Sequence, residues 1–294
     1  VYYRRKVILA LLQLFQGELE KIRLQKLLFL FTQEQETKIY DFVPYLYGCY
    51  SYSANADLTT MVNKDFLAES EKSFTRKDKT NYLATLTSQD FKLLMEVKDR
   101  YGNMNADALM KHTYVNFPYW AIKSVRAQSI LTDREMEKVY ASQPVGKEVV
   151  LFTIGYEGIS LEEYLNRLLI NDVKILVDVR NNPMSMKYGF SKSQLKRYCG
   201  SLGIEYLHLP EVGIQSNQRQ ELNEQGDYDR LFKIYRENNL SKTINVQNQI
   251  LSLLVKHQRI ALTCFEANIC QCHRKHLAEA IEKLPGFEYA VRHI

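Results

Sequence analysis

The feature that most constrains the fold is an alternation in the second half of the chain. Short apolar runs rich in β-branched residues predict strands at 148–154, 174–179, 205–209 and 259–264. Stretches with helical periodicity lie between and after them, at 161–170, 191–202, 228–237, 246–257 and from Cys272 onward. Strands that alternate with helices are typical of a parallel sheet with crossover connections. We therefore expect a Rossmann-like α/β domain over residues 148–294.

The first half has a different pattern, and we expect a separate, mostly helical domain over residues 1–145. Predicted helices contain the apolar positions of 7–15 and 22–31, and further helices fit 88–101, 105–113 and 132–140. The segment 141–147 contains Pro and Gly and predicts a linker. Three local features complete the prediction: a turn-bounded connector at 41–50, a helix N-cap at Ser53 and an exposed wing or hairpin at 69–81.

Composition narrows the class of protein. Of the 294 residues, 46% are hydrophobic and 25% are charged, which is ordinary for a globular chain and excludes collagen-like and disordered proteins. No apolar run is long enough to span a membrane, so we expect a cytoplasmic protein without membrane contact. The five cysteines favour free thiols over a disulfide framework. A net charge of +5 permits nucleic-acid binding without requiring it.

Polar residues gather where the predicted strands end, which is the edge at which parallel sheets bind ligands. Tyr156 and Glu157 follow the first strand, and Asp178, Arg180 and Ser185 follow the second. His208 ends the third strand. The fourth strand leads through Cys264 and Glu266 to the run Cys272, His273 and Arg274. The sequence therefore predicts one site at this edge, built from residues on four strand ends.

These motifs resemble the domain-of-unknown-function 488 family over residues 149–281. The matching stretches are TIGYEG at 153–158, DVRNNPMSMKYGFSK at 178–192, YLHLPEVG at 206–213, CFE at 264–266 and CHR at 272–274. The resemblance implies a fold and a site but no established reaction. The chain departs from the family pattern at Cys270, which adds a thiol two residues before Cys272. The first half, through LQKLLF at 24–29 and YDFVPYLYG at 40–48, resembles the winged-helix-like domain of Panacea-type antitoxins and related phage or defence proteins. That resemblance implies a recognition module for nucleic acid or protein.

Each candidate residue also has a structural interpretation. Asp178 and Arg180 form either a bracing ion pair or part of the site, and an ionised Asp178 suits orientation better than acid catalysis. Glu157 and Glu266 follow apolar strands, where partial burial would raise the pKa of either carboxyl group and suit it to acid–base work. Either glutamate would otherwise cap a loop. Tyr156 and His208 would bind substrate or pack against the sheet, and Ser185 is a further substrate-binding candidate.

The run at 272–274 opens the last predicted helix. Helix N-termini bind anions, and Arg274 offers a guanidinium fork for phosphate, with His273 beside it. The helix dipole would also favour a thiolate at Cys272, which makes Cys272 a candidate nucleophile. This role is less well supported than anion binding, because the sequence shows no paired base. Zinc is less well supported, because one residue separates Cys270 from Cys272 and Cys264 is expected to fill a buried strand. We therefore predict no metal site, and the sequence identifies no cofactor.

Taken together, the residues favour an enzyme that cleaves nucleic acid or a nucleotide by hydrolytic or glycosidic chemistry. Arg274 would hold phosphate, Asp178 would orient a group, and Glu157 or Glu266 would activate water. The alternative is a regulatory, antitoxin-like adaptor that binds DNA or a protein and senses a small anionic ligand. Basic residues near the N-terminus would contact a phosphate backbone in either case, or form a solvated helix face.

Overall fold

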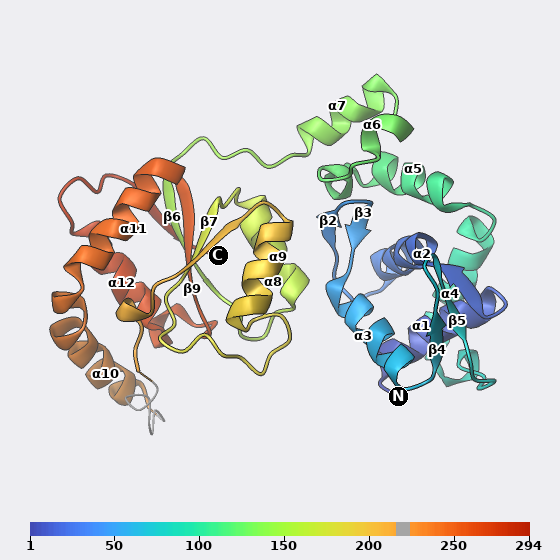
Figure 1. Cartoon of the computed structure of the whole chain (residues 1–294), viewed down its shortest axis with the longest axis horizontal. Coiled ribbons are helices and arrows are strands. Elements are labelled where there is room, and N and C mark those ends of the chain that lie inside the picture. The colour runs from blue at the N-terminus through green and yellow to red at the C-terminus, as the bar shows by residue number, and fades with distance from the viewer. Residues whose placement is uncertain (216–223) are drawn as a thin grey trace. The chain divides into compact units, whose positions relative to one another are not determined.

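The computed structural model describes residues 1–215 and 224–294, which form two compact units, Val1–Gln143 and Pro144–Ile294 (Figure 1). The boundary between the units falls inside the segment 141–147. The first unit is mostly helical and the second contains a five-stranded parallel sheet, so the expected mixed α/β class is confirmed. No helix within the described ranges is both long and apolar enough to cross a membrane.

Helices make up most of the first unit because apolar residues recur there at helical spacing. The helices are α1 (Tyr3–Leu14), α2 (Lys21–Glu34), α3 (Tyr52–Asn63), α4 (Ser88–Tyr101), α5 (Ala106–Asn116), α6 (Ala127–Ile130) and α7 (Asp133–Ala141). The core is formed mainly by α1 and α2, whose residues 7–12 and 24–32 are all buried. These two helices therefore provide the framework on which the smaller elements of the unit pack.

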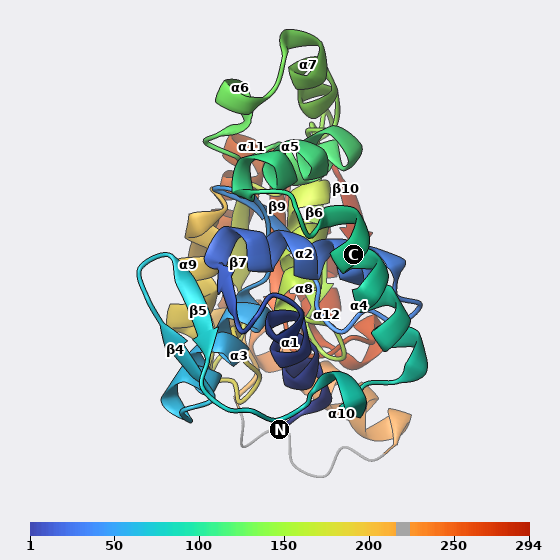
Figure 2. The ribbon, with the colours of Figure 1, turned by 90° about the vertical axis from the view of Figure 1, so that its right-hand side faces the viewer.

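Short strands complete the first unit. The antiparallel sheet β1-β5-β4 contains β1 (Glu18–Glu20), β4 (Leu67–Glu69) and β5 (Ser73–Arg76). The β4–β5 hairpin lies beside α1 and α3 (Figure 2). Its Phe74 is only 4% exposed and belongs to the core, so the expected exposed excursion at 69–81 is partly buried. The winged-helix interpretation of this unit stays a prediction.

Two local predictions in the first unit are wrong. The expected connector at 41–50 is a hairpin of β2 (Val43–Tyr45) and β3 (Gly48–Tyr50), in which Gly48 has a φ of +86°. Glycine adopts this conformation without the steric cost that a Cβ would impose. The N-cap of α3 is Ser51, whose side chain accepts a hydrogen bond from the Ala54 amide at 3.1 Å, whereas Ser53 lies inside the helix.

The second unit is built around the sheet β10-β6-β9-β7-β8, in which all strands are parallel. The strands are β6 (Val150–Gly155), β7 (Ile175–Asp178), β8 (Glu205–His208), β9 (Arg259–Cys264) and β10 (Ala290–His293). The first four match predicted strands within two residues at each end. Every residue of β6, β7 and β9 is buried, as expected for strands covered on both faces.

Helices cover both faces of this sheet, giving three layers (Figure 1). On one face lie α8 (Leu161–Ile170) and α9 (Lys192–Ser201). On the other face, α10 (Gln225–Asn238), α11 (Ile244–His257) and α12 (His273–Glu282) pack on alternate strand residues such as Leu151, Val177 and Leu262. The helices α8 and α9 follow β6 and β7, whereas α12 follows β9, which lies between those two strands.

This arrangement creates a switch point at the carboxyl end of β9. The connections from the neighbouring strands β6 and β7 leave toward one face, and the connection from β9 leaves toward the other (Figure 1). A crevice forms where connections diverge in this way, and open α/β sheets bind their ligands there. The topology therefore predicts a ligand site at Cys264 and the loop that follows it.

Candidate functional site

A pocket of about 300 Å³ opens at this switch point. Its wall includes Cys264 at the end of β9 and Phe265 after it, and Tyr156 after β6. The loop that follows β7 supplies most of the remaining lining, namely Arg180, Asn181, Asn182, Met184, Ser185 and Met186, and Ile214 completes it. Polar groups make up slightly more of the exposed lining than apolar groups do, so this pocket is more polar than most small-molecule sites.

Asp178 and Arg180 form a buried ion pair beneath this pocket. The carboxylate of Asp178 is completely buried, and it accepts hydrogen bonds from Arg180 Nε at 2.8 Å and Nη2 at 2.5 Å. The Arg180 amide at 3.2 Å and the Tyr206 hydroxyl at 2.6 Å also donate to this carboxylate. Arg180 Nη1 donates to the hydroxyl of Tyr156 at 2.7 Å and to the carbonyl of Phe190 at 3.0 Å. Hydrogen bonding to Asp178 raises the pKa of Arg180 despite its burial.

These contacts favour the bracing role of the pair over direct participation in chemistry. The charge of Arg180 is balanced by Asp178, and its donors hold the loop after β7 against β6. Tyr156 is 2% exposed and its ring stacks on Phe190 at 4.3 Å, so it packs against the sheet while its edge reaches the pocket. The pocket wall at this point is consequently rigid and close to electrically neutral.

The contacts of His208 also favour a structural role over substrate binding. Its Nε2 lies 2.8 Å from the carbonyl oxygen of Arg180, and its Nδ1 lies 3.1 Å from Lys192 Nζ. A carbonyl can only accept, so Nε2 carries the proton and Nδ1 accepts from the lysine. His208 is therefore placed to fix the loop after β7, and it does not line the pocket in this conformation. Ser185 does line the pocket, and its Oγ accepts from the Lys187 amide at 3.2 Å.

The two candidate glutamates lie in different environments. Glu157 is exposed, contrary to the partial burial expected from its position after an apolar strand, because the chain turns outward at Gly158 with a φ of +78°. Its carboxylate accepts from the Ala267 amide at 3.0 Å, and its own amide donates to the Phe265 carbonyl at 2.9 Å. Glu157 is therefore next to the lining residues Tyr156 and Phe265, although it does not itself line the pocket. Glu266 is half-buried and faces Cys264, at 3.0 Å from Oε2 to Sγ.

Arg274 is 2% exposed, and its guanidinium contacts backbone oxygens. Nη1 donates to the carbonyl of Glu266 at 2.5 Å and Nη2 donates to that of Ala267 at 3.3 Å. Nε lies 3.4 Å from the hydroxyl of Thr153 on β6. These contacts favour a role in holding the loop after β9. The phosphate-binding role suggested by sequence stays a prediction, and it would require the side chain to exchange its partners.

Cys272 is the N-cap of α12 and is completely buried. Burial and the neighbouring Cys264 raise the pKa of the Cys272 thiol well above its usual range. These effects disfavour a nucleophilic thiolate at this position. His273 is also fully buried, and its Nε2 lies 3.0 Å from the carbonyl oxygen of Val179.

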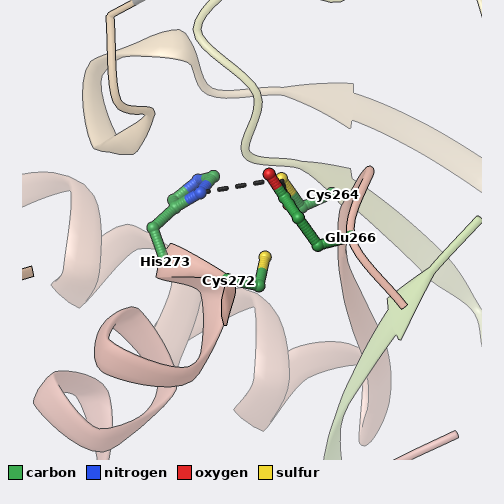
Figure 3. Close-up of side chains that lie close together, drawn as sticks. All are labelled: Cys264, Glu266, Cys272 and His273. Atoms are coloured by element: carbon green, nitrogen blue, oxygen red, sulfur yellow. Dashed lines mark hydrogen bonds between the residues drawn. The ribbon is translucent and has the colours of Figure 1, made fainter. Parts of the chain in front are cut away.

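The structure therefore brings Cys272 and His273 together with Cys264 and Glu266, beside the pocket (Figure 3). One donor atom from each lies within 4.8 Å of the others. Several lining residues were not among the predicted site residues, namely Asn181, Asn182, Met184, Met186, Ile214 and Phe265. The signal for the two asparagines was present, since they directly follow the predicted strand that ends in Asp178 and Arg180.

Comparison with known protein families supports the family resemblance of the second unit. Residues 160–281 match the family described as Domain of unknown function DUF488, a range that starts after the TIGYEG stretch and is narrower than the 149–281 expected from sequence. No curated protein matches the chain. The resemblance of the first unit to Panacea-type antitoxins stays a prediction. The match over residues 160–281 supports the resemblance of the second unit to the DUF488 family that the sequence motifs indicate.

Proposed function

We propose that the second unit is a hydrolase that cleaves the N-glycosidic bond of a nucleotide or of an accessible nucleotide in nucleic acid, acting in the cytoplasm. The observation that carries the proposal is the pocket at the switch point, which combines aromatic and aliphatic side chains with the amides of Asn181 and Asn182. A volume of about 300 Å³ is at the lower end for ligand sites, and suits one base and its sugar better than a duplex.

Electrostatics supports a base as the group bound in the pocket. Arg180 in the wall is neutralised by Asp178, so the wall offers little attraction for a phosphate. The amides of Asn181 and Asn182 provide both donors and acceptors, which can pair with the edge of a base. Phe265, which is 42% exposed, offers an aromatic surface for stacking. The phosphate and the rest of the chain would then lie outside the pocket.

Glu157 is the group that we propose activates water. Its exposed carboxylate, on the residue next to the lining residue Tyr156, would take a proton from a water molecule, whose oxygen attacks the sugar carbon. The bond between that carbon and the base nitrogen breaks, and the proton passes to the departing base. The products are a free base and a sugar that carries a hydroxyl in its place, so oxidant and reductant are not needed.

The test is to incubate the full chain with free nucleotides, single-stranded DNA, double-stranded DNA and single-stranded RNA, and to look for released base by mass. We expect release from at least one of these substrates and a loss of about a hundredfold or more in Glu157→Gln, as is usual for a general base. Glu205→Gln is the matched control, because Glu205 is an exposed glutamate at the other end of a sheet strand. Failure to release base from any substrate, or full activity of Glu157→Gln, would overturn the proposal.

A second candidate function is an adaptor without turnover, favoured by a cavity of about 600 Å³ in the first unit. Tyr45, Tyr47 and Tyr50 of the β2–β3 hairpin line it and offer surfaces for stacking. Lys72 could contact phosphate, whereas the other lining lysine, Lys21, pairs with Glu69, and Glu20 and Glu71 also line the cavity. An adaptor of this kind would bind nucleic acid with an affinity that falls steeply with salt, and would return it with its mass unchanged. Lys72→Ala, with exposed Lys64→Ala as control, would weaken that binding.

A further inference from the structure

The strongest unassigned feature of the second unit is the cluster Cys264, Glu266, Cys272 and His273. The side chains converge from two elements, with Cys264 and Glu266 at the end of β9 and Cys272 and His273 at the start of α12 (Figure 3). Two thiols, one imidazole and one carboxylate are together a zinc-type donor set. We infer that this cluster is a zinc site, which the sequence spacing had led us not to expect.

The distances agree with tetrahedral zinc. Bonds of about 2.3 Å to sulfur and 2.0–2.1 Å to nitrogen place these two ligand atoms about 3.6 Å apart around a tetrahedral ion. Cys264 Sγ and His273 Nδ1 lie 3.6 Å apart. All ligand atoms of the cluster lie within 4.8 Å of one another, so one ion can reach each of them after small side-chain movements. Glu266 would move away from Cys264 by roughly half an ångström to complete the tetrahedron.

The surroundings of His273 orient it as a metal ligand. Its Nε2 donates to the carbonyl of Val179 at 3.0 Å, which leaves the lone pair of Nδ1 directed at the cluster. The ring of Tyr235 packs edge-on against the imidazole at 5.5 Å and fixes its plane. Metal-binding histidines characteristically donate their second ring nitrogen to a carbonyl or carboxylate, so this contact is independent support for the site.

Charge and burial are compatible with a bound ion. Cys264 is 1% exposed and Cys272 and His273 are completely buried, so three of the four ligands are shielded from water. Only Glu266 is half-buried, which marks it as the ligand closest to solvent. Two thiolates and one carboxylate exceed the charge of Zn²⁺ by one unit, and the guanidinium of Arg274 binds the backbone carbonyl of Glu266 at 2.5 Å nearby. On binding, each thiol gives one proton to solvent and its sulfur forms a bond to zinc.

The sequence offers zinc-type ligands at Cys264, Cys270, Cys272, His273 and His276, and the single residue between Cys270 and Cys272 argues against a site. In the structure Cys264, Cys272 and His273 converge, whereas Cys270 is exposed and neither Cys270 nor His276 is part of the cluster. Glu266, an acid–base candidate from sequence, is the fourth member. The site goes beyond the proposed hydrolase, whose water-activating group is Glu157, and zinc would tie the end of β9 to the start of α12.

The test is metal binding by the full chain, measured without any activity assay. Protein stripped with a chelator is titrated with Zn²⁺, and with Co²⁺ as a spectroscopic probe, and bound metal is counted by native mass spectrometry. We expect one ion per chain, thiolate-to-cobalt charge-transfer absorption, tetrahedral Co²⁺ bands and a higher melting temperature with Zn²⁺. A chain that binds no stoichiometric metal would overturn the inference.

Variants assign the site to this cluster. Cys272→Ser should lower zinc affinity at least about a hundredfold, since loss of an outer-shell partner alone costs roughly 10–100-fold. Cys270→Ser is the matched control two residues away, and should bind as the unchanged chain does. Glu266→Ala changes only the half-buried ligand, which keeps the test informative if Cys272→Ser does not fold. It should retain the charge-transfer absorption and bind more weakly. Equal losses in Cys270→Ser and Cys272→Ser, or unchanged affinity in Glu266→Ala, would refute the assigned ligands.

Discussion

The buried pair of Asp178 and Arg180 gives the sharpest prediction about stability. Their side chains are 0% and 6% exposed, so solvent screening does little to weaken the interaction. Removing one partner leaves the other charge buried without compensation, which costs about 3–5 kcal/mol. We therefore expect Asp178→Ala and Arg180→Met each to lower the free energy of unfolding of the second unit by that amount. This is a large part of the roughly 5–15 kcal/mol by which domains are stable.

The double variant distinguishes a charge effect from simple loss of packing. Asp178→Ala with Arg180→Met removes both charges but leaves the Phe190 carbonyl without its arginine donor, at a cost of about 1–3 kcal/mol. We therefore expect a loss of about 3 kcal/mol, far below the 6–10 kcal/mol that additive single losses would give. Tyr206→Phe, which removes one donor at 2.6 Å, should cost about 1.5 kcal/mol.

The assay is native-state hydrogen exchange of the full chain, read by mass spectrometry on peptides that contain β6, β7 and β9. The sole tryptophan, Trp120, lies in the first unit, and its fluorescence during urea unfolding is the internal control. An unchanged Trp120 transition would locate the effect in the second unit. A loss below 1 kcal/mol in Asp178→Ala, or a double variant that equals the sum of the single ones, would refute the reasoning.

Three further predictions concern the room for a Cβ at two glycines, a helix cap and a buried lysine. Gly155→Ala would place a Cβ 2.0 Å from the Glu266 carbonyl oxygen and should destabilise the second unit by about 1–3 kcal/mol in thermal melts, whereas Gly200→Ala in α9 meets nothing within 4 Å and should be neutral or stabilising. Ser51→Ala should cost about 1 kcal/mol in urea unfolding followed by Trp120, and a larger loss in Ser53→Ala would contradict the cap assignment. Lys26 is 1% exposed and donates to the Cys49 carbonyl at 2.9 Å, and burial lowers its pKa from the usual 10.5. The unfolded chain therefore binds more protons between the two pKa values, so the stability of the unchanged chain relative to Lys26→Met should rise as pH increases from neutrality toward 10.5. A difference between the two chains that stays constant or falls over this range would contradict that sign.

Sequence periodicity was sufficient to predict most helices and strands, and to predict the edge of the sheet at which the pocket lies. The predicted helix 161–170 coincides with α8, and 88–101 coincides with α4, because buried faces impose a repeat that survives in a single sequence. Parallel strands with apolar runs also placed Tyr156, Asp178, His208 and Cys264 at one edge, since the carboxyl ends of parallel strands share it. The strand β10 escaped prediction because Ala290–His293 is largely exposed, and it exists as a strand only where β6 offers a free edge.

Which side chains meet was decided by tertiary structure. From the sequence, Asp178 and Arg180 could either brace the loop or take part in the chemistry. The hydrogen bonds that Tyr156, Tyr206 and Phe190 make with this pair favour the bracing role. The sequence places Cys272 close to Cys270 along the chain, whereas the loop after β9 folds back so that Cys272 meets Cys264. Local spacing encodes the repeat of one helix or strand, but the distance between the end of β9 and the start of α12 depends on how both pack on the sheet. For that physical reason the sequence by itself determined the elements and the edge, and only the packed fold decided the cluster and the pocket.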